Sequence, residues 1–215
     1  MKRLAATLIV IGVAAHTASG HAQDRNGRLF PPLNLGLLEG PDRDEWQKPD
    51  QIMDALRIAD GSVVADLGCG AGWFTVRLAR RVGPNGLVYA EDVQVEMIRA
   101  TVGRVQREGL RNVKPILGTQ DDPRLPPGQI DALLIVGAYH EIVSPVALLR
   151  NVARALKPTG RLGIVDFTAG DGGPGPPAEE RVDPAVILRD AERAGLRLLR
   201  QESVLPFQYL LIFGK

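Results

Sequence analysis

The sequence contains few of the residues that metal sites and disulfide scaffolds require. Cys69 is the single cysteine, so the chain forms no internal disulfide and depends on an apolar core for stability. His16, His21 and His140 are the three histidines, too few for a zinc site of the usual type. A Ser-His-Asp triad would depend on His140, and the G-x-S-x-G nucleophile elbow is absent. The sequence therefore argues against metal and serine-triad chemistry.

An excess of charge of either sign is also missing. The chain has 26 lysines and arginines, 25 aspartates and glutamates, and a formal net charge of +1. Nothing in this balance favours a nucleic-acid partner or a membrane surface, and we expect neither. A length of 215 residues, 45% of them hydrophobic, suits one soluble globular domain with a real core.

The first residues have the pattern of a secretory signal peptide. Lys2 and Arg3 precede an apolar run over residues 4–15, and Gly20-His21-Ala22 has the small-x-small form of a cleavage site. The run is too short for a membrane span of about 20 residues. We predict cleavage after Ala22, export to the periplasm and no stable membrane insertion afterwards. The alternatives are an uncut anchor, or a spurious leader on a cytoplasmic protein.

The rest of the chain divides into an arm and one domain. Residues 23–47 are polar and contain prolines, which predicts an irregular arm, and 48–215 form the domain. Within the domain, apolar residues at helical spacing alternate with short β-branched runs. The predicted helices cover 49–61, 73–83, 94–109, 144–160 and 183–195, with Ser144 as an N-cap. The predicted strands cover 62–67, 86–92, 112–117, 131–137, 161–167, 196–204 and 207–215.

This alternation predicts the fold class. Strands without clean alternation are expected where helices cover both faces of a sheet, and alternating strands and helices form right-handed parallel units. The link between the last two strands is too short for a crossover, so they must be antiparallel. We predict an α/β fold: a Rossmann-like three-layer αβα sandwich of about seven strands, mostly parallel with the last strand antiparallel.

A glycine-rich turn follows the first strand of the domain. Glycines at 68, 70 and 72 let a ligand approach backbone that side chains would otherwise block. The dinucleotide fingerprint G-x-G-x-x-G fails here, because Trp73 occupies the place of its third glycine. Asp66, two residues before the first glycine, would repel a phosphate and suit a cation. The turn therefore predicts a positively charged nucleoside ligand.

A second carboxylate site follows the next strand. The segment "VYAED" ends about 20 residues after the last glycine, where ribose hydroxyls are bound in such folds. Glu91 or Asp92 could accept both hydroxyls, and the position favours Asp92.

These segments carry a resemblance to a known family. "VVADLGCGAGWFTVRLA" followed by "LVYAEDVQVEMI" resembles motif I and its acidic partner in class I S-adenosylmethionine-dependent methyltransferases. The resemblance extends from about Trp46 to the C-terminus, through "GTQDDPRLPPGQIDALLIVGAYHEI" and "ALLRNVARALKPTGRLGIVDF". It implies S-adenosyl-L-methionine as the cofactor and methyl transfer as the activity.

The resemblance also implies roles for individual residues. The loop from Asp66 to Gly72 would hold the methionine part of the cofactor, with Asp66 near its ammonium group. Asp92 would bind the ribose and Val93 would pack on adenine. Asp121, with Asp122 as a close rival, would accept the adenine amino group. The implied cofactor-binding residues are Asp66, Gly68, Cys69, Gly70, Gly72, Asp92, Val93, Asp121, Asp122 and Gly137.

The acceptor site is less defined by the sequence. The resemblance implies that residues 137–139 line the methyl-transfer site, and we expect a small-molecule acceptor between residues 23–48, 137–145 and 168–182. His140 and Tyr139 are the catalytic candidates. His140 could be a general base or a hydrogen-bonded loop residue, and Tyr139 could shape the pocket by packing. The rival functions are a nicotinamide-dependent oxidoreductase and a non-catalytic relic, which export would favour.

Overall fold

The structure is a computed structural model that describes residues 28–170 and 172–215. The predicted signal peptide, residues 1–22, lies outside the described residues, as does the start of the predicted arm. No helix in the described part of the chain is long and apolar enough to cross a membrane.

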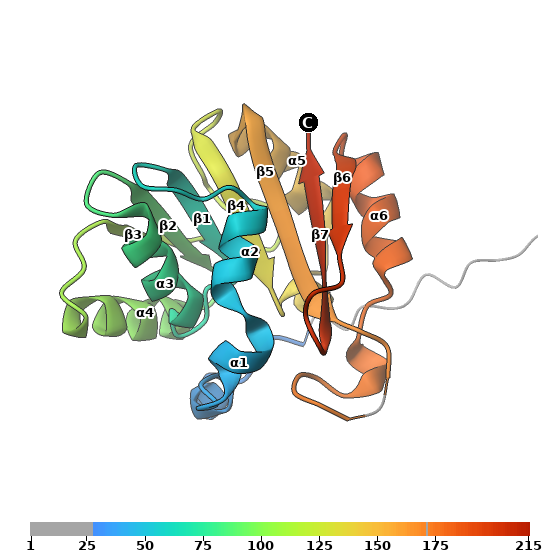
Figure 1. The fold of residues 1–215 in the computed structure, drawn as a ribbon, viewed down its shortest axis with the longest axis horizontal. Helices are drawn as coiled ribbons and strands as arrows, with labels where there is room; N and C mark the ends of the chain where they lie inside the picture. The colour runs from blue at the N-terminus through green and yellow to red at the C-terminus, as the bar shows by residue number, and fades with distance from the viewer. Residues whose placement is uncertain (1–27, 171) are drawn as a thin grey trace, which may run out of the picture.

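The described residues form one seven-stranded sheet with helices on both faces (Figure 1). The strand order is β3-β2-β1-β4-β5-β7-β6. The strands are β1 (Val63–Leu67), β2 (Leu87–Asp92), β3 (Val113–Leu117), β4 (Ile130–Val136), β5 (Leu156–Phe167), β6 (Arg197–Glu202) and β7 (Gln208–Gly214). The longer helices are α2 (Pro49–Ala55), α3 (Trp73–Val82), α4 (Val95–Arg107), α5 (Pro145–Ala155) and α6 (Pro184–Arg193).

The pairing confirms the predicted Rossmann-like αβα fold. Strands β1 to β5 pair in parallel, whereas β7 runs antiparallel to both β5 and β6. The first strand lies between β2 and β4, so the strand order reverses beside it. Open α/β sheets bind ligands at such a switch point, beyond the carboxyl ends of the strands.

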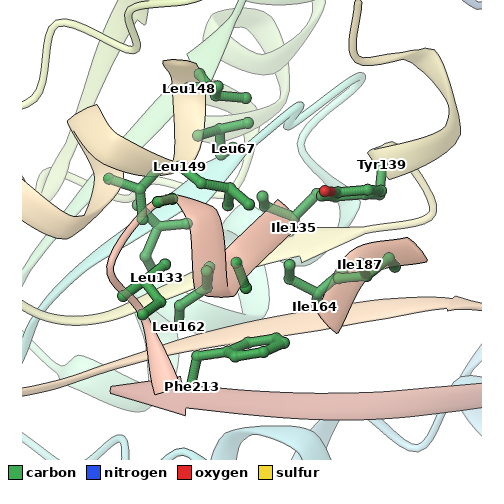
Figure 2. Packing of buried hydrophobic residues seen from close by; sticks show 14 of the residues in the cluster. Leu67, Leu133, Ile135, Tyr139, Leu148, Leu149, Leu162, Ile164, Ile187 and Phe213 are labelled. Atoms are coloured by element: carbon green, nitrogen blue, oxygen red, sulfur yellow. The ribbon is translucent and has the colours of Figure 1, made fainter. Parts of the chain in front are cut away.

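Two buried clusters hold the layers together. On one face, helices α2 and α3 pack on the sheet through residues such as Ile52, Leu78 and Val82. On the other face, α5 and α6 pack through Leu149 and Ile187 (Figure 2). Fully burying one such aliphatic side chain stabilises the fold by about 1.5–3 kcal/mol. The core therefore supplies the stability that a chain with one cysteine must obtain without disulfides.

The arm differs from its prediction. Its described part is not irregular throughout: it contains a 3₁₀ helix η1 (Pro32–Leu38) and a short helix α1 (Arg43–Gln47). Helix α1 is held by tertiary contacts, because the Gln47 amide donates a buried hydrogen bond of 2.8 Å to Gln208 at the start of β7. Asp44 also forms an ion pair with Arg77 of α3. These contacts join segments far apart in the sequence, so local patterns could not predict them.

Two predicted helices end early, for identifiable reasons. Helix α2 stops at Ala55, shortly before Arg57 adopts a left-handed backbone with φ of 59°. Helix α5 stops at Ala155, because Pro158 disfavours a helical conformation before it and Leu156 already begins β5. Ser144 is the N-cap residue of α5, but its side chain makes no capping hydrogen bond.

The turn between α3 and β2 provides a test of the packing. A Cβ atom at Gly86 would lie 2.6 Å from the Ser62 carbonyl oxygen, which accepts the N–H of Leu87. We expect Gly86→Ala to lower the free energy of unfolding by about 1–3 kcal/mol, as overpacking does. Gly170→Ala is the control, because nothing lies within 4 Å of a Cβ there. Urea titration of both variants measures the difference, and equal stabilities would contradict the packing described.

Candidate functional site

A cavity of about 880 Å³ lies beyond the carboxyl ends of β1, β2 and β4. Its walls come from the loops after these strands, from the described part of the arm and from the loop after β5. Ligand pockets in proteins have volumes of roughly 300–1,000 Å³. The cavity is thus large enough for a nucleoside with a small substituent.

The glycine-rich turn comes close to its neighbours on both sides. The N–H groups of Gly68 and Cys69 each donate a 2.9 Å hydrogen bond to the Glu91 carbonyl oxygen. Gly68 has a left-handed backbone with φ of 72°, and a Cβ there would lie 2.8 Å from Ala138 Cβ. Gly68, Cys69, Gly70 and Gly137 line the cavity, as expected. Gly72 does not line the cavity. It directly precedes α3 and lies against Thr101 of α4.

Opposite charges lie at one end of the cavity. Asp66 lines it and accepts a 2.6 Å hydrogen bond from the Thr75 hydroxyl. Burial raises the pKa of Asp66 to about 6, although Thr75 and the charge of Arg43 act against this shift. Arg43, from α1, also lines the cavity, and burial lowers its pKa to about 10. A carboxylate and a guanidinium in one wall can bind a zwitterion.

Asp92 is held in place by backbone donors. Its Oδ2 accepts the N–H of Gly70 at 3.0 Å, and its Oδ1 accepts the N–H of Gln94 at 2.9 Å. Asp92 and Val93 both line the cavity, as expected. Burial raises the pKa of Asp92, and the backbone hydrogen bonds oppose that rise. Each oxygen keeps a further lone pair for a ligand hydroxyl.

Glu91 lies beside Asp92 in a different environment. Its Oε1 is buried without a hydrogen-bond partner among the described residues. Burial, followed by the neighbouring charge of Asp92, raises the pKa of Glu91 to about 8. The Glu91 side chain is therefore uncharged at neutral pH.

His140 faces a buried carboxylate that the sequence analysis did not select. Its Nδ1 lies 3.8 Å from Oδ2 of Asp166, a residue at the end of β5, and neither atom has a hydrogen-bond partner among the described residues. His140 lines the cavity, and its Nε2 lies 3.8 Å from Oε1 of Glu141. The position of Asp166 at the carboxyl end of a strand next to β4 is the signal that could have indicated it.

Tyr139, a predicted catalytic residue, does not line the cavity. Its side chain is fully buried in the cluster under α6 (Figure 2). Its hydroxyl donates a 3.0 Å hydrogen bond to Asp190. Its neighbour His140 points to the site instead, because adjacent residues of the 3₁₀ helix η2 (Tyr139–Glu141) face different directions. The prediction that Tyr139 lines the methyl-transfer site is wrong.

Asp121 and Asp122 also lie outside the lining of the cavity. Asp121 is exposed and accepts a 2.8 Å hydrogen bond from the Thr119 hydroxyl, while Asp122 accepts the N–H of Arg124 at 2.8 Å. Thr119 and Gln120 line the cavity in their place. The turn closes one or two residues earlier than the sequence suggested, since the Thr119 N–H bonds to the Asp122 carbonyl.

Arg43 is another cavity-lining residue that the sequence analysis did not select. Its guanidinium lies 4.1 Å from the centre of the Trp73 ring, and Arg77 lies 3.5 Å from the same centre. Such cation–π contacts, together with the 2.6 Å hydrogen bond from Arg43 to Gln47, fix the side chain over the glycine-rich turn. A half-buried arginine on a short helix leaves no periodic signal in the sequence.

Comparison with known proteins places the chain in a family. Residues 64–160 match a methyltransferase domain model. A crystal structure of a SAM-dependent methyltransferase from Aquifex aeolicus is 30% identical, with a TM-score of 0.82 over 86% of this chain and 98% of that chain. This chain belongs to the class I S-adenosylmethionine-dependent methyltransferases.

Curated relatives of this methyltransferase domain match over a shorter range. The nocamycin O-methyltransferase of Saccharothrix syringae is 32% identical over 131 residues, which are 61% of this chain and 44% of that protein. The demethylmenaquinone methyltransferase of Listeria welshimeri is 28% identical over 122 residues, or 57% of this chain and 51% of that protein. The chain thus spans about half the length of the curated relatives it matches.

The buried position of Tyr139 predicts a structural effect. Tyr139→Phe removes a hydrogen bond from a buried carboxylate, so the free energy of unfolding should fall by about 1–3 kcal/mol. The affinity for S-adenosylhomocysteine should stay unchanged, because the hydroxyl is outside the cavity. Urea titration measures the free energy of unfolding, and calorimetry measures the affinity. A loss of affinity at unchanged stability would show that the Tyr139 hydroxyl contributes to ligand binding.

The environment of Glu91 predicts a pH effect on stability. Because its pKa rises from 4.5 to about 8 on folding, Glu91 favours folding below pH 4.5 and loses that contribution as the pH rises to 8. The loss is about 1.4 kcal/mol per pH unit in this window. Glu91→Gln should remove this slope, so its stability relative to wild type should increase from pH 5 to pH 8. If the difference in free energy of unfolding between Glu91→Gln and wild type did not change with pH, the pKa of Glu91 would not be raised by folding.

Proposed function

We propose that this chain binds S-adenosyl-L-methionine and transfers its methyl group to a small-molecule acceptor. The observation that carries the proposal is the arrangement of charge in one cavity. Asp66 and Arg43 line one part of the wall, and Asp92 with Val93 lines another. These groups complement an α-amino acid joined to a nucleoside, which is the chemistry of this cofactor.

Each part of the cofactor has suitable residues in the wall. Asp66 would accept the ammonium group and Arg43 would bind the carboxylate, forming charge-assisted hydrogen bonds. Asp92 would accept the ribose hydroxyls. Adenine would pack on Val93, with Gln120 as the polar side chain nearby. When bound, the cofactor supplies a methyl group activated by the positive charge on sulfur.

The acceptor would occupy the part of the cavity next to β4 and β5. Gly137, at the end of β4, packs against Phe167, and Trp46 of α1 lies 6.2 Å from the Phe167 ring. Phe207, 6.4 Å from Trp46, completes an aromatic wall. An apolar wall of this kind excludes water and favours alignment of the acceptor behind the methyl group.

Family membership and charge both disfavour the oxidoreductase alternative. A dinucleotide would place its pyrophosphate at the glycine-rich turn, close to the carboxylates of Asp66 and Asp92. The non-catalytic relic remains the rival proposal. Turnover of labelled cofactor with a panel of acceptors distinguishes it, because a relic would bind the cofactor without consuming it.

Domain boundaries and export are part of the proposal. We retain a cleaved signal peptide at 1–22, an arm at 23–47, a methyltransferase domain at 48–215 and a periplasmic location. The contacts of Arg43 and Gln47 with the domain support the view that the arm completes the site. N-terminal sequencing of the protein from cell fractions tests both cleavage and location.

Calorimetric titration with S-adenosylhomocysteine tests the cofactor site. We expect binding well below millimolar, and a loss of at least about tenfold, or 1.4 kcal/mol, in Asp92→Ala and in Arg43→Gln. Asp121→Ala is the matched control, because the Asp121 side chain lies outside the cavity. The melting temperatures should change little.

No binding by the folded wild-type protein would end the proposal. Equal losses in Asp92→Ala and Asp121→Ala would show that the placement of the ribose is wrong.

A further inference from the structure

The pairing of His140 with Asp166 suggests what kind of acceptor the site takes. Asp166 is completely buried, and its Oδ1 accepts the N–H of Phe167 at 2.8 Å. Its Oδ2 has no hydrogen-bond partner among the described residues and lies 3.8 Å from Nδ1 of His140. A buried carboxylate favours the imidazole tautomer whose proton lies on the ring nitrogen that faces it, and for His140 and Asp166 that nitrogen is Nδ1. The lone pair then lies on Nε2, which is 3.8 Å from Oε1 of the cavity-lining residue Glu141.

The groups around His140 are acidic. Asp166 from β5, Glu141 from η2 and Glu180 from the 3₁₀ helix η3 (Ala178–Glu180) act on it. Burial acts to lower the pKa of His140, but these three carboxylates outweigh burial and raise the pKa above its usual value. A base whose pKa lies near the working pH is the most effective for proton transfer.

The walls near His140 restrict the acceptor further. Glu141 and Glu180 line the cavity, so an acceptor with a carboxylate or phosphate would be repelled. Apolar side chains line the cavity as well: Phe30, Trp46, Phe167 and Phe207, with prolines of the loop after β5, beside the uncharged amides of Gln47 and Gln208. A neutral molecule with an aromatic or other apolar body fits these surroundings.

The geometry points to an acceptor with a phenolic or enolic hydroxyl on a neutral, largely apolar body, deprotonated by His140 and with Asp166 as the positioning residue. This inference rests on the proposed methyl transfer. Ionised carboxylates and thiolates need no base, and a neutral amine already has a free lone pair. A phenolic hydroxyl, in contrast, is a weak nucleophile until it loses its proton.

The proposed methyl transfer needs only the acceptor, the cofactor and His140 to account for every bond, proton and electron pair. The acceptor oxygen forms a bond to the methyl carbon while its proton passes to Nε2 of His140. The carbon–sulfur bond breaks, and its electron pair stays on sulfur, which becomes a neutral thioether. The resulting imidazolium is stabilised by Asp166, Glu141 and Glu180, and it returns its proton to water.

Histidine NMR of the full chain tests the pairing without any acceptor. The His140 signal is assigned by its loss in His140→Asn. We expect the tautomer with the proton on Nδ1, and a fall in the pKa of His140 in Asp166→Asn, because the neutral amide no longer stabilises the imidazolium. Asp190→Asn, also a buried carboxylate replacement, is the control and should leave this pKa unchanged. The opposite tautomer, or equal titration in wild type and Asp166→Asn, would overturn the pairing.

Labelled methyl transfer to three matched probes tests the acceptor class. The probes are 2-naphthol, 2-naphthalenethiol and 2-naphthylamine, which share one apolar body. We expect label in 2-naphthol, with a rate that rises with pH as His140 loses its proton. The rate should fall by about 10²–10⁴ in His140→Asn, whose amide keeps a donor toward Asp166. In Asp166→Asn the increase of the methyl-transfer rate with pH should occur at lower pH, because the pKa of His140 falls.

The outcomes separate this inference from the proposed function. If S-adenosylhomocysteine binds but 2-naphthol is not methylated, or is methylated equally by His140→Asn, the acceptor class is wrong. Transfer to the amine or thiol that is independent of His140 would also overturn it. If S-adenosylhomocysteine does not bind, the proposed function itself fails, whatever the NMR shows about the pairing.

Discussion

The site depends on the attachment of the glycine-rich turn to the end of β2. The N–H groups of Gly68 and Cys69 bond to the Glu91 carbonyl, and the N–H of Gly70 bonds to Asp92. This attachment turns the backbone beside Asp66 toward the cavity and orients Asp92. It needs glycine at position 68, because the backbone there is left-handed and a Cβ atom would lie only 2.8 Å from the Cβ of Ala138. Main-chain hydrogen bonds therefore hold both the turn and Asp92, in the part of the cavity that we propose binds the cofactor.

The proposed acceptor end is assembled differently. It uses side chains from segments distant in sequence: Trp46 from α1, His140 from η2, Phe167 from β5 and Phe207 before β7. Arg181 fastens the loop after β5, donating to the carbonyl oxygens of Thr168, Gly170 and Pro176. Side chains on loops can change without altering the sheet, and this is where members of one fold differ in substrate. The division explains why the cofactor part of the site was easier to foresee than the acceptor part.

The sequence predicted what depends on local pattern. The parallel strands follow from the alternation of strand and helix patterns, and the antiparallel β7 follows from the short link before it. The positions of Asp66, the glycine-rich turn and Asp92 follow from spacing along the first strand–turn–helix–strand unit. Arg43 and Asp166 escaped notice because their roles arise from contacts across more than 20 residues of sequence. Tyr139 was misplaced since a 3₁₀ turn sends adjacent side chains in different directions, and Asp121 because the turn after β3 closes earlier than its sequence suggested. These two errors concern the direction of side chains and the position of a turn, whereas the helices of the arm were missed because tertiary contacts hold them.

A crystal structure of the protein with S-adenosylhomocysteine tests the central claim most directly. The account predicts the amino acid group between Asp66 and Arg43, the ribose hydroxyls on Asp92 and the sulfur facing Gly137 and His140. A ligand bound in the reverse direction, with adenine beside Asp66, or bound outside the cavity, would contradict it.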